Sequence, residues 1–395
     1  MKTASDPLHR VVRHIRRCCG AFADGYFIRS KNTSLFCPSR ISPDAKYWDH
    51  PIIIPSVLKD CMTLRIDIDA DILHLSGVEQ LYAFLNDIEK PLIQLLNGQP
   101  GIRGETIIKD DFDKISHPQS PITLLSAIFR PLQEARLPGI SLYLHGSMAD
   151  QTYTSFSDVD DLVVMQKEAW QDLDNLTRIG TELTKIANSY QNVDPLQHHG
   201  HWLITEFDLL SYDSSYLPLV VLEGAKRVTG NSWFEFCVQD NPHGFMENAI
   251  ATIKSINNRL GQSANGKGLN AYDLKGLVGE IAIVPAYLFQ TKGELISKKQ
   301  AIKASRKIYS PLGYRAVEWA TMVRKKFDMC VRNRRMNLLK KFAGYAVTRR
   351  HQAEKLIKMF SIWIGNEHPL GLNLNVRKSI EAFVRETELL TKQQD

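Results

Sequence analysis

The stretch YLHGSMADQTYTSFSDVDDLVV, residues 143–164, decides the fold of this chain. It joins two apolar runs, each typical of a β-strand, through a polar segment that begins with Gly146 and Ser147. Glycine lets backbone N–H groups approach an anion closely, and serine adds a hydroxyl donor. The Gly-Ser pair is therefore predicted to be a phosphate-binding turn at the end of the first strand.

Three aspartates, Asp158, Asp160 and Asp161, stand where the second strand begins. Side chains at i and i+2 of a strand point to the same side, so Asp158 and Asp160 are predicted to act together. Asp161 is predicted to face away, as a cap or a surface charge. Two neighbouring carboxylates repel each other and need a cation between them. Mg²⁺ (or Mn²⁺) fits this need, because it takes oxygen ligands and also binds phosphate.

The segment HWLITEFDLLSY, residues 201–212, is predicted to be a third strand. It carries Glu206 and Asp208, again at i and i+2. If this strand lies beside the second one, either residue can complete a three-carboxylate site. A phosphate cradle beside carboxylate-bound metal ions is suited to nucleotidyl transfer, in which one ion activates the attacking oxygen and the other holds the triphosphate.

The run HHGHW, residues 198–202, also suggests a zinc site. Its histidines lack a fourth ligand at a suitable spacing. A loop that packs against the site or touches substrate is therefore the favoured interpretation.

LHGSMADQTYTSFSDVDDLVV resembles the signature of the DNA polymerase β-like nucleotidyltransferase superfamily. In that signature a strand is followed by Gly-Ser, about ten further residues, and Asp-x-Asp on the next strand. The resemblance implies that Asp158 and Asp160 are catalytic metal ligands. It also implies that Gly146 and Ser147, with the nearby Ser157, hold the triphosphate.

TEFDLLSYD, residues 205–213, looks like the third acidic strand of the same superfamily. The resemblance favours Asp208 as the third catalytic carboxylate and metal ligand. Glu206 is a competitor, because in the aminoglycoside adenylyltransferase branch a glutamate on this strand is the general base. Both residues can serve, one for the metal and one as the base.

The stretch EIAIVPAYLFQTKGELISKKQAI, residues 280–302, is similar to the helical C-terminal domain of streptomycin/spectinomycin-type adenylyltransferases. Lys298 matches the lysine that reaches the ATP phosphates in those enzymes, where a positive charge stabilises the leaving pyrophosphate. The resemblance implies ATP as the triphosphate and AMP as the transferred group. It covers about residues 140–325.

The wider pattern predicts an α+β protein in three parts. Residues 1–118 form an α/β segment of unknown role, with β-like runs at 51–56 and 62–70 and a helix at 77–96. Residues 119–235 form a nucleotidyltransferase-fold domain, with a mixed sheet and helices that include one near 216–230. Residues 236–395 form an all-α domain with a basic face.

Composition narrows the class of protein. The 395 residues are 44% hydrophobic and 23% charged, which is typical of globular domains. No run of about 18 apolar residues is present, so no membrane partner is expected. No apolar segment follows the basic N-terminal stretch, so no signal peptide is expected. Six cysteines without CxxC spacing predict reduced thiols in a cytoplasmic protein.

The charge of +6 is unevenly distributed along the chain. Residues 324–358 hold twelve Lys or Arg and only two acids. This run predicts a surface that attracts polyanions. It favours RNA or protein as the acceptor of the nucleotide, whereas the C-terminal resemblance favours a small molecule such as an aminoglycoside.

Two alternatives to an enzyme remain at this point. The chain can be a catalytically silent nucleotidyltransferase-fold module that binds or regulates a partner. It can also be a nucleic-acid-binding protein that acts through the basic run at 324–358.

Overall fold

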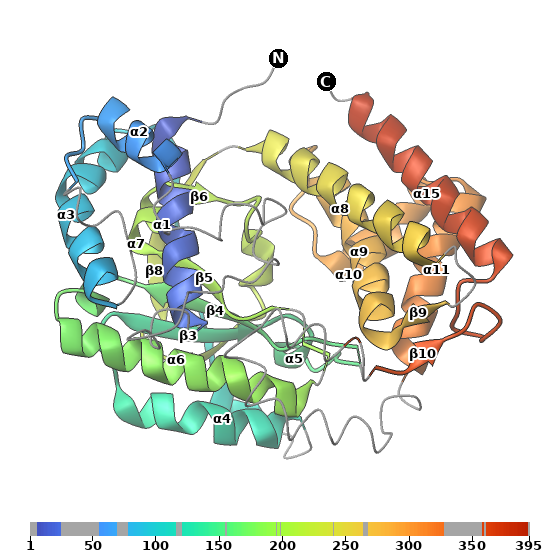
Figure 1. The fold of residues 1–395 in the computed structure, drawn as a ribbon, viewed down its shortest axis with the longest axis horizontal. Helices are drawn as coiled ribbons and strands as arrows, with labels where there is room; N and C mark the ends of the chain where they lie inside the picture. The colour runs from blue at the N-terminus through green and yellow to red at the C-terminus, as the bar shows by residue number, and fades with distance from the viewer. Residues whose placement is uncertain are drawn as a thin grey trace.

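The protein is described by a computed structural model that covers residues 6–24, 55–68, 78–115, 121–154, 156–194, 196–197, 199–239, 241–263, 268–327, 358 and 361–393. The predicted β-like residues 51–54 and most of the basic run at 324–358 lie outside these ranges. The described chain is α+β, as predicted. An α/β part and a helical part lie side by side in Figure 1.

A five-stranded mixed sheet forms the centre of the α/β part, with strand order β2-β7-β3-β4-β5. β3 runs antiparallel to both β7 and β4, and β4 runs parallel to β5. The middle strands are rich in Val, Ile and Leu because both faces of the sheet are covered. The strands are β2 (Asp110–Asp111), β7 (Lys226–Thr229), β3 (Ile140–His145), β4 (Asp160–Met165) and β5 (Trp202–Thr205).

Helices cover one face of this sheet and bury their apolar sides against it (Figure 1). Leu142, Leu144 and Val163 of the sheet share one core with helices that precede residue 119 and with helices that follow it. The segment before 119 therefore belongs to the same core as the sheet. These helices are α1 (Pro7–Ala23), α2 (Pro55–Thr63), α3 (Val78–Asn97), α4 (Ile122–Ala135) and α6 (Leu173–Val193).

A second, three-stranded sheet packs near the opposite face. Its strand order is β1-β8-β6, and its aromatic residues form a small core with Tyr143 and Leu162 of the central sheet. The strands are β1 (Ile102–Ile107), β8 (Trp233–Gln239) and β6 (Tyr212–Asp213).

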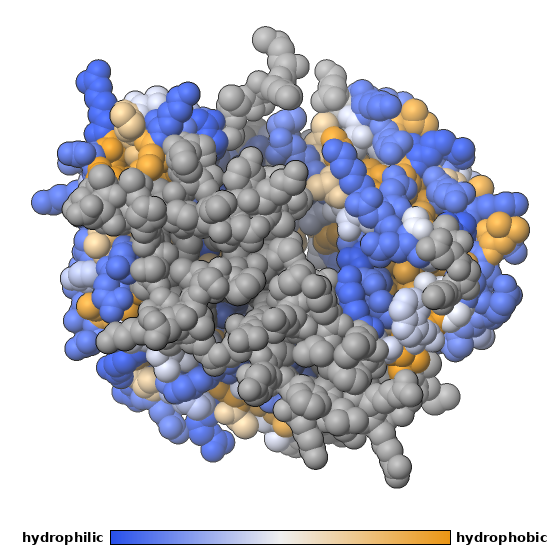
Figure 2. All heavy atoms as spheres, viewed as in Figure 1, coloured by the Kyte–Doolittle hydropathy of each residue, from blue (hydrophilic) through white to orange (hydrophobic). Residues whose placement is uncertain are grey.

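The helical part is built around α9, which is apolar on nearly all sides and is buried between its neighbours. Described residues of both parts present mainly hydrophilic side chains on the face seen in Figure 2, with small hydrophobic patches between them. The elements are α8 (Pro242–Ser263), β9 (Leu269–Asn270), α9 (Ala271–Gln290), α10 (Lys298–Ala304), α11 (Pro311–Lys326), β10 (Trp363–Ile364) and α15 (Leu374–Lys392).

Several predicted elements are confirmed and others are wrong: residues 55–56 of the β-like run belong to α2, and the predicted all-α part also contains β9 and β10. The helix at 77–96 and the two strands around the Gly-Ser turn are present as α3, β3 and β4. The third strand ends at Thr205, because a short helix, α7 (Glu206–Leu210), follows it. The predicted helix near 216–230 is a 3₁₀ turn followed by β7. The predicted strand at 62–70 is, where described, the end of α2 and irregular chain.

The described helices include none that is both long and apolar enough to cross a membrane. The cysteines that the structure describes form no disulfide bond: Cys18, Cys19, Cys61 and Cys237.

Candidate functional site

The Gly-Ser turn lies at the end of β3, directly beside Asp160. Gly146 has a φ of +67° and begins the short helix α5 (Gly146–Ala149). A Cβ atom at this position would lie 2.7 Å from Oδ2 of Asp160. Only glycine combines this backbone conformation with so close an approach. Ser147 follows it and is half-buried.

Asp158 and Asp160 approach the same place from the start of β4. The side chain of Gln197 holds the residue between them, because it accepts a hydrogen bond from Val159 N (2.9 Å) and donates one to Val159 O (3.0 Å). The loop before Asp158 is fixed from the other side, since the ring of Phe156 stacks on Phe327 of the helical part at 3.7 Å. The two carboxylates therefore lie where the α/β and helical parts meet.

Lys275 reaches Asp158 from α9. Its Nζ donates to Asp158 Oδ1 at 2.6 Å, to Asp194 Oδ2, and to Leu196 O at 3.3 Å. Burial disfavours the charged amine, but Asp158 and Asp194 outweigh this effect and raise the pKa of Lys275. Burial raises the pKa of Asp194 to about 7 against the pull of Lys275.

His199 is the partner of Asp160. Its Nε2 lies 3.1 Å from Asp160 Oδ1. Burial disfavours the imidazolium, but the bond to Asp160 and the charge of Asp158 raise the pKa of His199 to about 9. His199 is therefore charged at neutral pH. Burial also opposes ionisation of Asp160, yet His199 lowers the pKa of this carboxyl.

Two further cations of the helical part interact electrostatically with the carboxylates. Lys298 begins α10, and Arg324 lies on the last turn of α11. Desolvation by the surrounding protein and the charge of Arg324 lower the pKa of Lys298 to about 8, and the charges of Asp160 and Asp158 oppose this shift. The residue as a whole is still exposed to solvent. Burial lowers the pKa of Arg324, and the same two aspartates oppose the change. Lys298 is therefore near enough to Asp158 and Asp160 for their charges to act on it, and its predicted contact with the ATP phosphates stays a prediction.

His145 completes the immediate surroundings. It precedes Gly146, lies opposite Asp160 in the β3–β4 register, and is 4% exposed. Within the described part of the chain, neither ring nitrogen has a hydrogen-bond partner. Burial lowers the pKa of His145, against the charge of Asp160, so the ring is neutral.

Glu206 and Asp208 do not join this group, which corrects the prediction of a third carboxylate. β5 runs parallel to β4, and Thr205 is opposite Met165. Glu206 and Asp208 follow Thr205, so they lie beyond the end of β4 that is farthest from Asp160. Five residues of strand separate the two ends, or about 16 Å. Because both residues lie on α7, they also do not share a strand face.

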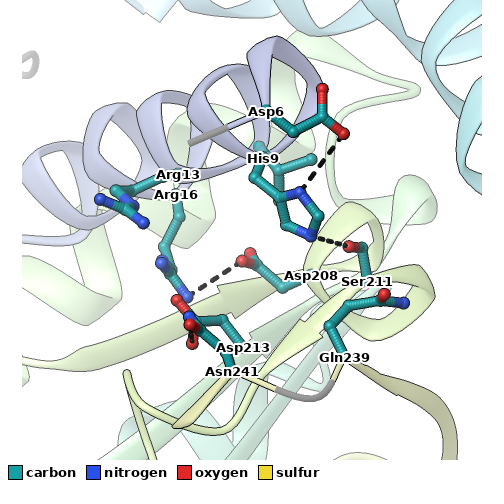
Figure 3. Close-up of a pocket in the computed structure, with 10 residues that line it drawn as sticks. Asp6, His9, Arg13, Arg16, Asp208, Ser211, Asp213, Gln239 and Asn241 are labelled. Atoms are coloured by element: carbon teal, nitrogen blue, oxygen red, sulfur yellow. Dashed lines mark hydrogen bonds and ion pairs between the residues drawn. The ribbon is translucent and has the colours of Figure 1, made fainter. Parts of the chain in front are cut away.

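Asp208 has a structural role where it lies. Its Oδ2 accepts hydrogen bonds from Thr205 N and Oγ1 (2.8 Å each), which caps α7, and its Oδ1 pairs with Arg16 of α1 at 3.2 Å. Figure 3 shows this pair at a cavity of about 200 Å³ between α1 and the second sheet. Burial raises the pKa of Asp208, with Arg16 opposing. Glu206 accepts from Lys167 N at 2.7 Å instead.

Asp161 and Ser157 also differ from expectation. Asp161 faces away from the site, as predicted, but it is fully buried rather than a cap or surface charge. Its Oδ2 accepts from Tyr190 Oη and lies 2.6 Å from His201 Nδ1. Ser157 is buried, and its Oγ accepts from Thr154 N at 2.8 Å. This bond closes the turn before Asp158, so the Ser157 hydroxyl is used inside the loop.

The described residues offer a divalent ion two carboxylates, so a bound nucleotide would have to supply further oxygen ligands. No cluster of three or more His, Cys, Asp or Glu side chains able to hold a metal occurs in the described ranges. Asp158 and Asp160 form a pair, and Mg²⁺ is often bound by one or two carboxylates together with substrate phosphates and water. The pair therefore fits a metal–nucleotide complex better than a free ion.

The prediction from sequence missed Lys275, His199 and Gln197 as parts of the site. Lys275 carried a visible signal, because it is the one basic residue in the mainly apolar run 271–290. The HHGHW run predicts a loop near the site, and His199 of this run contacts Asp160. His198 lies outside the described residues. Gln197 gave no signal, because its role depends on tertiary contacts.

Comparison with known proteins gives no match to a family model, a curated protein or a solved structure.

Proposed function

We propose that this chain binds a nucleoside triphosphate, with ATP as the expected one, and transfers its nucleoside monophosphate to a hydroxyl acceptor with release of pyrophosphate. One observation carries the proposal. Asp160 lies beside the glycine turn of Gly146 and interacts with the charge of Asp158, and Lys298 and Arg324 of the helical part interact electrostatically with both carboxylates. Carboxylates suit a phosphate-bound cation, and the two basic groups suit the phosphates themselves.

The order of elements supports a nucleotidyltransferase fold. β3, the Gly-Ser turn and β4 form an antiparallel pair, and α6 then leads to β5, parallel to β4. The resemblance of residues 143–164 to the polymerase β-like signature implies this arrangement. The adenylyltransferase resemblance implies a lysine at the phosphates, which would be Lys298 of the helical part. Arg324 is a second cation of that part.

The residues of the chain have separate roles in this reaction. Lys298 and Arg324 bind the β- and γ-phosphates and stabilise the charge that develops on pyrophosphate. The backbone of the Gly146 turn orients the triphosphate. The acceptor oxygen then bonds to the α-phosphorus, the bond to pyrophosphate breaks, and the hydroxyl proton is released. Mg²⁺ bound at Asp158 and Asp160 would supply charge neutralisation to the phosphates.

The test is transfer of label from each nucleoside triphosphate, carrying ³²P at either the α or the γ position, with Mg²⁺ or Mn²⁺. Parallel acceptors are tRNA, cell-extract protein and an aminoglycoside panel. We expect label from the α position only, in one acceptor pool, and none with Asp160→Asn. Label from the γ position would indicate a kinase and contradict the proposal.

A second candidate is a nucleotide-binding module without transfer. It is favoured by the separation of Glu206 and Asp208 from the site, because neither of the two predicted third carboxylates is then available to the reaction. In this case, nucleotide binds with the same dependence on Lys298 and Arg324, but no acceptor receives label.

A further inference from the structure

The two aspartates of the site have partners of different kinds. Lys275, which holds Asp158, has a side chain 2% exposed, whereas His199, which holds Asp160, has a side chain 31% exposed. A buried partner is difficult to displace, and a half-exposed one can turn into solvent. The two carboxylates are therefore not equivalent toward an incoming cation.

Lys275 is fixed by complete hydrogen bonding. An ammonium group has three N–H donors. Here the acceptors are Asp158, Asp194 and the carbonyl of Leu196. Moving Lys275 aside would leave a buried amine and two buried or half-buried carboxylates without these partners.

Asp160 keeps one carboxylate oxygen turned away from His199, and its side chain is 27% exposed. Its Oδ1 is taken by His199, but its Oδ2 points to the glycine turn, where a Cβ at Gly146 would touch it. A phosphate held by that turn would lie next to Oδ2. An ion bridging Asp160 and a phosphate is thus placed by the backbone itself.

We propose that Lys275 is a built-in cation that occupies the place of one of the two divalent ions, so that the site binds a single divalent ion, held by Asp160 and the triphosphate. This inference rests on the proposed function and refines it. A second ion at Asp158 would meet the ammonium of Lys275, and like charges in a site of low polarity repel strongly. Among the described residues no group of three or more His, Cys, Asp or Glu side chains could hold a metal, and Asp194, the carboxylate next to Asp158, is itself paired with Lys275, which agrees with one ion.

The test counts Mn²⁺ by electron paramagnetic resonance on the full chain, with a non-hydrolysable α,β-methylene analogue of ATP. We expect one protein-bound Mn²⁺ per bound nucleotide. Asp160→Asn is expected to weaken binding of the Mn²⁺–nucleotide complex at least tenfold, and Asp158→Asn less than threefold. Equal losses for these two variants would overturn the inference.

Removal of the lysine gives a second measurement. Lys275→Met uncovers Asp158 and Asp194, so the count should rise to two ions per nucleotide. Lys254→Met, at an exposed position of α8, is the matched control and should keep one. If Lys275→Met does not fold, the comparison of the aspartate variants decides alone.

The outcomes separate this inference from the proposed function. Two ions in the wild-type chain, or none, overturn the inference while nucleotide binding stands. A chain that binds no nucleotide overturns the proposed function, and the inference with it.

Discussion

At the scale of single residues, Gly146 sets how closely the backbone approaches Asp160. Its φ of +67° lies in the left-handed region, and a Cβ would lie 2.7 Å from Asp160 Oδ2 and 3.3 Å from Asp160 Cβ. A side chain here would both strain the backbone and push the carboxylate away. The glycine therefore serves the fold and the proposed site together.

Gly146→Ala is expected to lower the free energy of unfolding by about 1–3 kcal/mol and to abolish tight nucleotide binding. Urea unfolding and calorimetric titration with an ATP analogue measure the two effects. Gly261→Ala is the matched control, because nothing lies within 4 Å of a Cβ there and alanine suits the helix. Unchanged affinity in Gly146→Ala would argue against the turn as a phosphate cradle.

The pair of His201 and Asp161 predicts a dependence of stability on pH. Burial disfavours charged His201, but Asp161 outweighs it and raises the pKa of His201 from 6.5 to about 9. Because the folded pKa is the higher one, protonated His201 stabilises the fold fully below about pH 6.5, and this stabilisation is lost as pH rises through 9. The loss is on the order of 3 kcal/mol.

The measurement is the free energy of unfolding between pH 6 and 10. His201→Gln should reduce the decline seen in the wild-type chain, and the remaining decline is expected from His199, whose pKa is also raised to about 9. A wild-type decline that the substitution leaves unchanged would assign the dependence to another group.

At the scale of elements, α7 shows why the sequence pattern predicted the wrong position for Glu206 and Asp208. The run HWLITEFDLLSY alternates enough to suggest one long strand, yet Thr205 and Asp208 form a capping box that starts a helix after four residues of β5. The signal T-E-F-D was present in the sequence. The acidic pattern of this run also fits a third acidic strand, and that interpretation puts Asp208 in the site, whereas the structure puts it at the cap of α7.

The link between α1 and α7 makes the N-terminal helix necessary for the α/β part. Arg16→Met should lower the free energy of unfolding by about 3–5 kcal/mol, because it leaves Asp208 buried without its cation. Arg13→Met, one turn away and half-buried, should change it by less than about 1 kcal/mol. Similar losses in both variants would contradict the role of the pair.

Asp208 and Asp160 can be separated by nucleotide affinity. Asp208→Asn is expected to reduce stability while leaving the affinity of the folded chain for an ATP analogue within twofold. Asp160→Asn is expected to lower that affinity at least tenfold, with Mg²⁺ present. Loss of affinity in Asp208→Asn at a temperature where the chain is folded would restore it as a site residue.

At the scale of the whole molecule, the proposed site is formed by residues of both the α/β part and the helical part. Local patterns predicted β3, β4, α3, α6 and the helical nature of the C-terminal part. They also placed Gly146, Asp158 and Asp160 together, whereas Lys298 was assigned to the site only by the resemblance to adenylyltransferases. Contacts between distant segments could not be predicted, because Lys275, Gln197 and Phe156 act only when the two parts are packed against each other.

Nucleotide should therefore stabilise the packing of both parts. A ligand that binds only the folded chain at 100 times its Kd adds about 2.7 kcal/mol. Phe156→Ala removes the stack on Phe327 and should reduce both the Tm and this nucleotide-dependent gain. Leu374→Ala, an exposed position on α15, should change neither. A full gain in Phe156→Ala would show that its loop does not position the site.

The most direct test of the central claim is the affinity for a Mg²⁺–ATP analogue in two matched double variants. Lys298→Ala with Arg324→Ala removes the cations that interact electrostatically with Asp158 and Asp160, whereas Lys299→Ala with Lys325→Ala removes their exposed neighbours. We predict a loss of about 100-fold or more in the first, since each charged hydrogen bond contributes about 1.5–3 kcal/mol, and less than twofold in the second. Equal affinities in the two double variants, or no binding by the wild-type chain, would contradict the account.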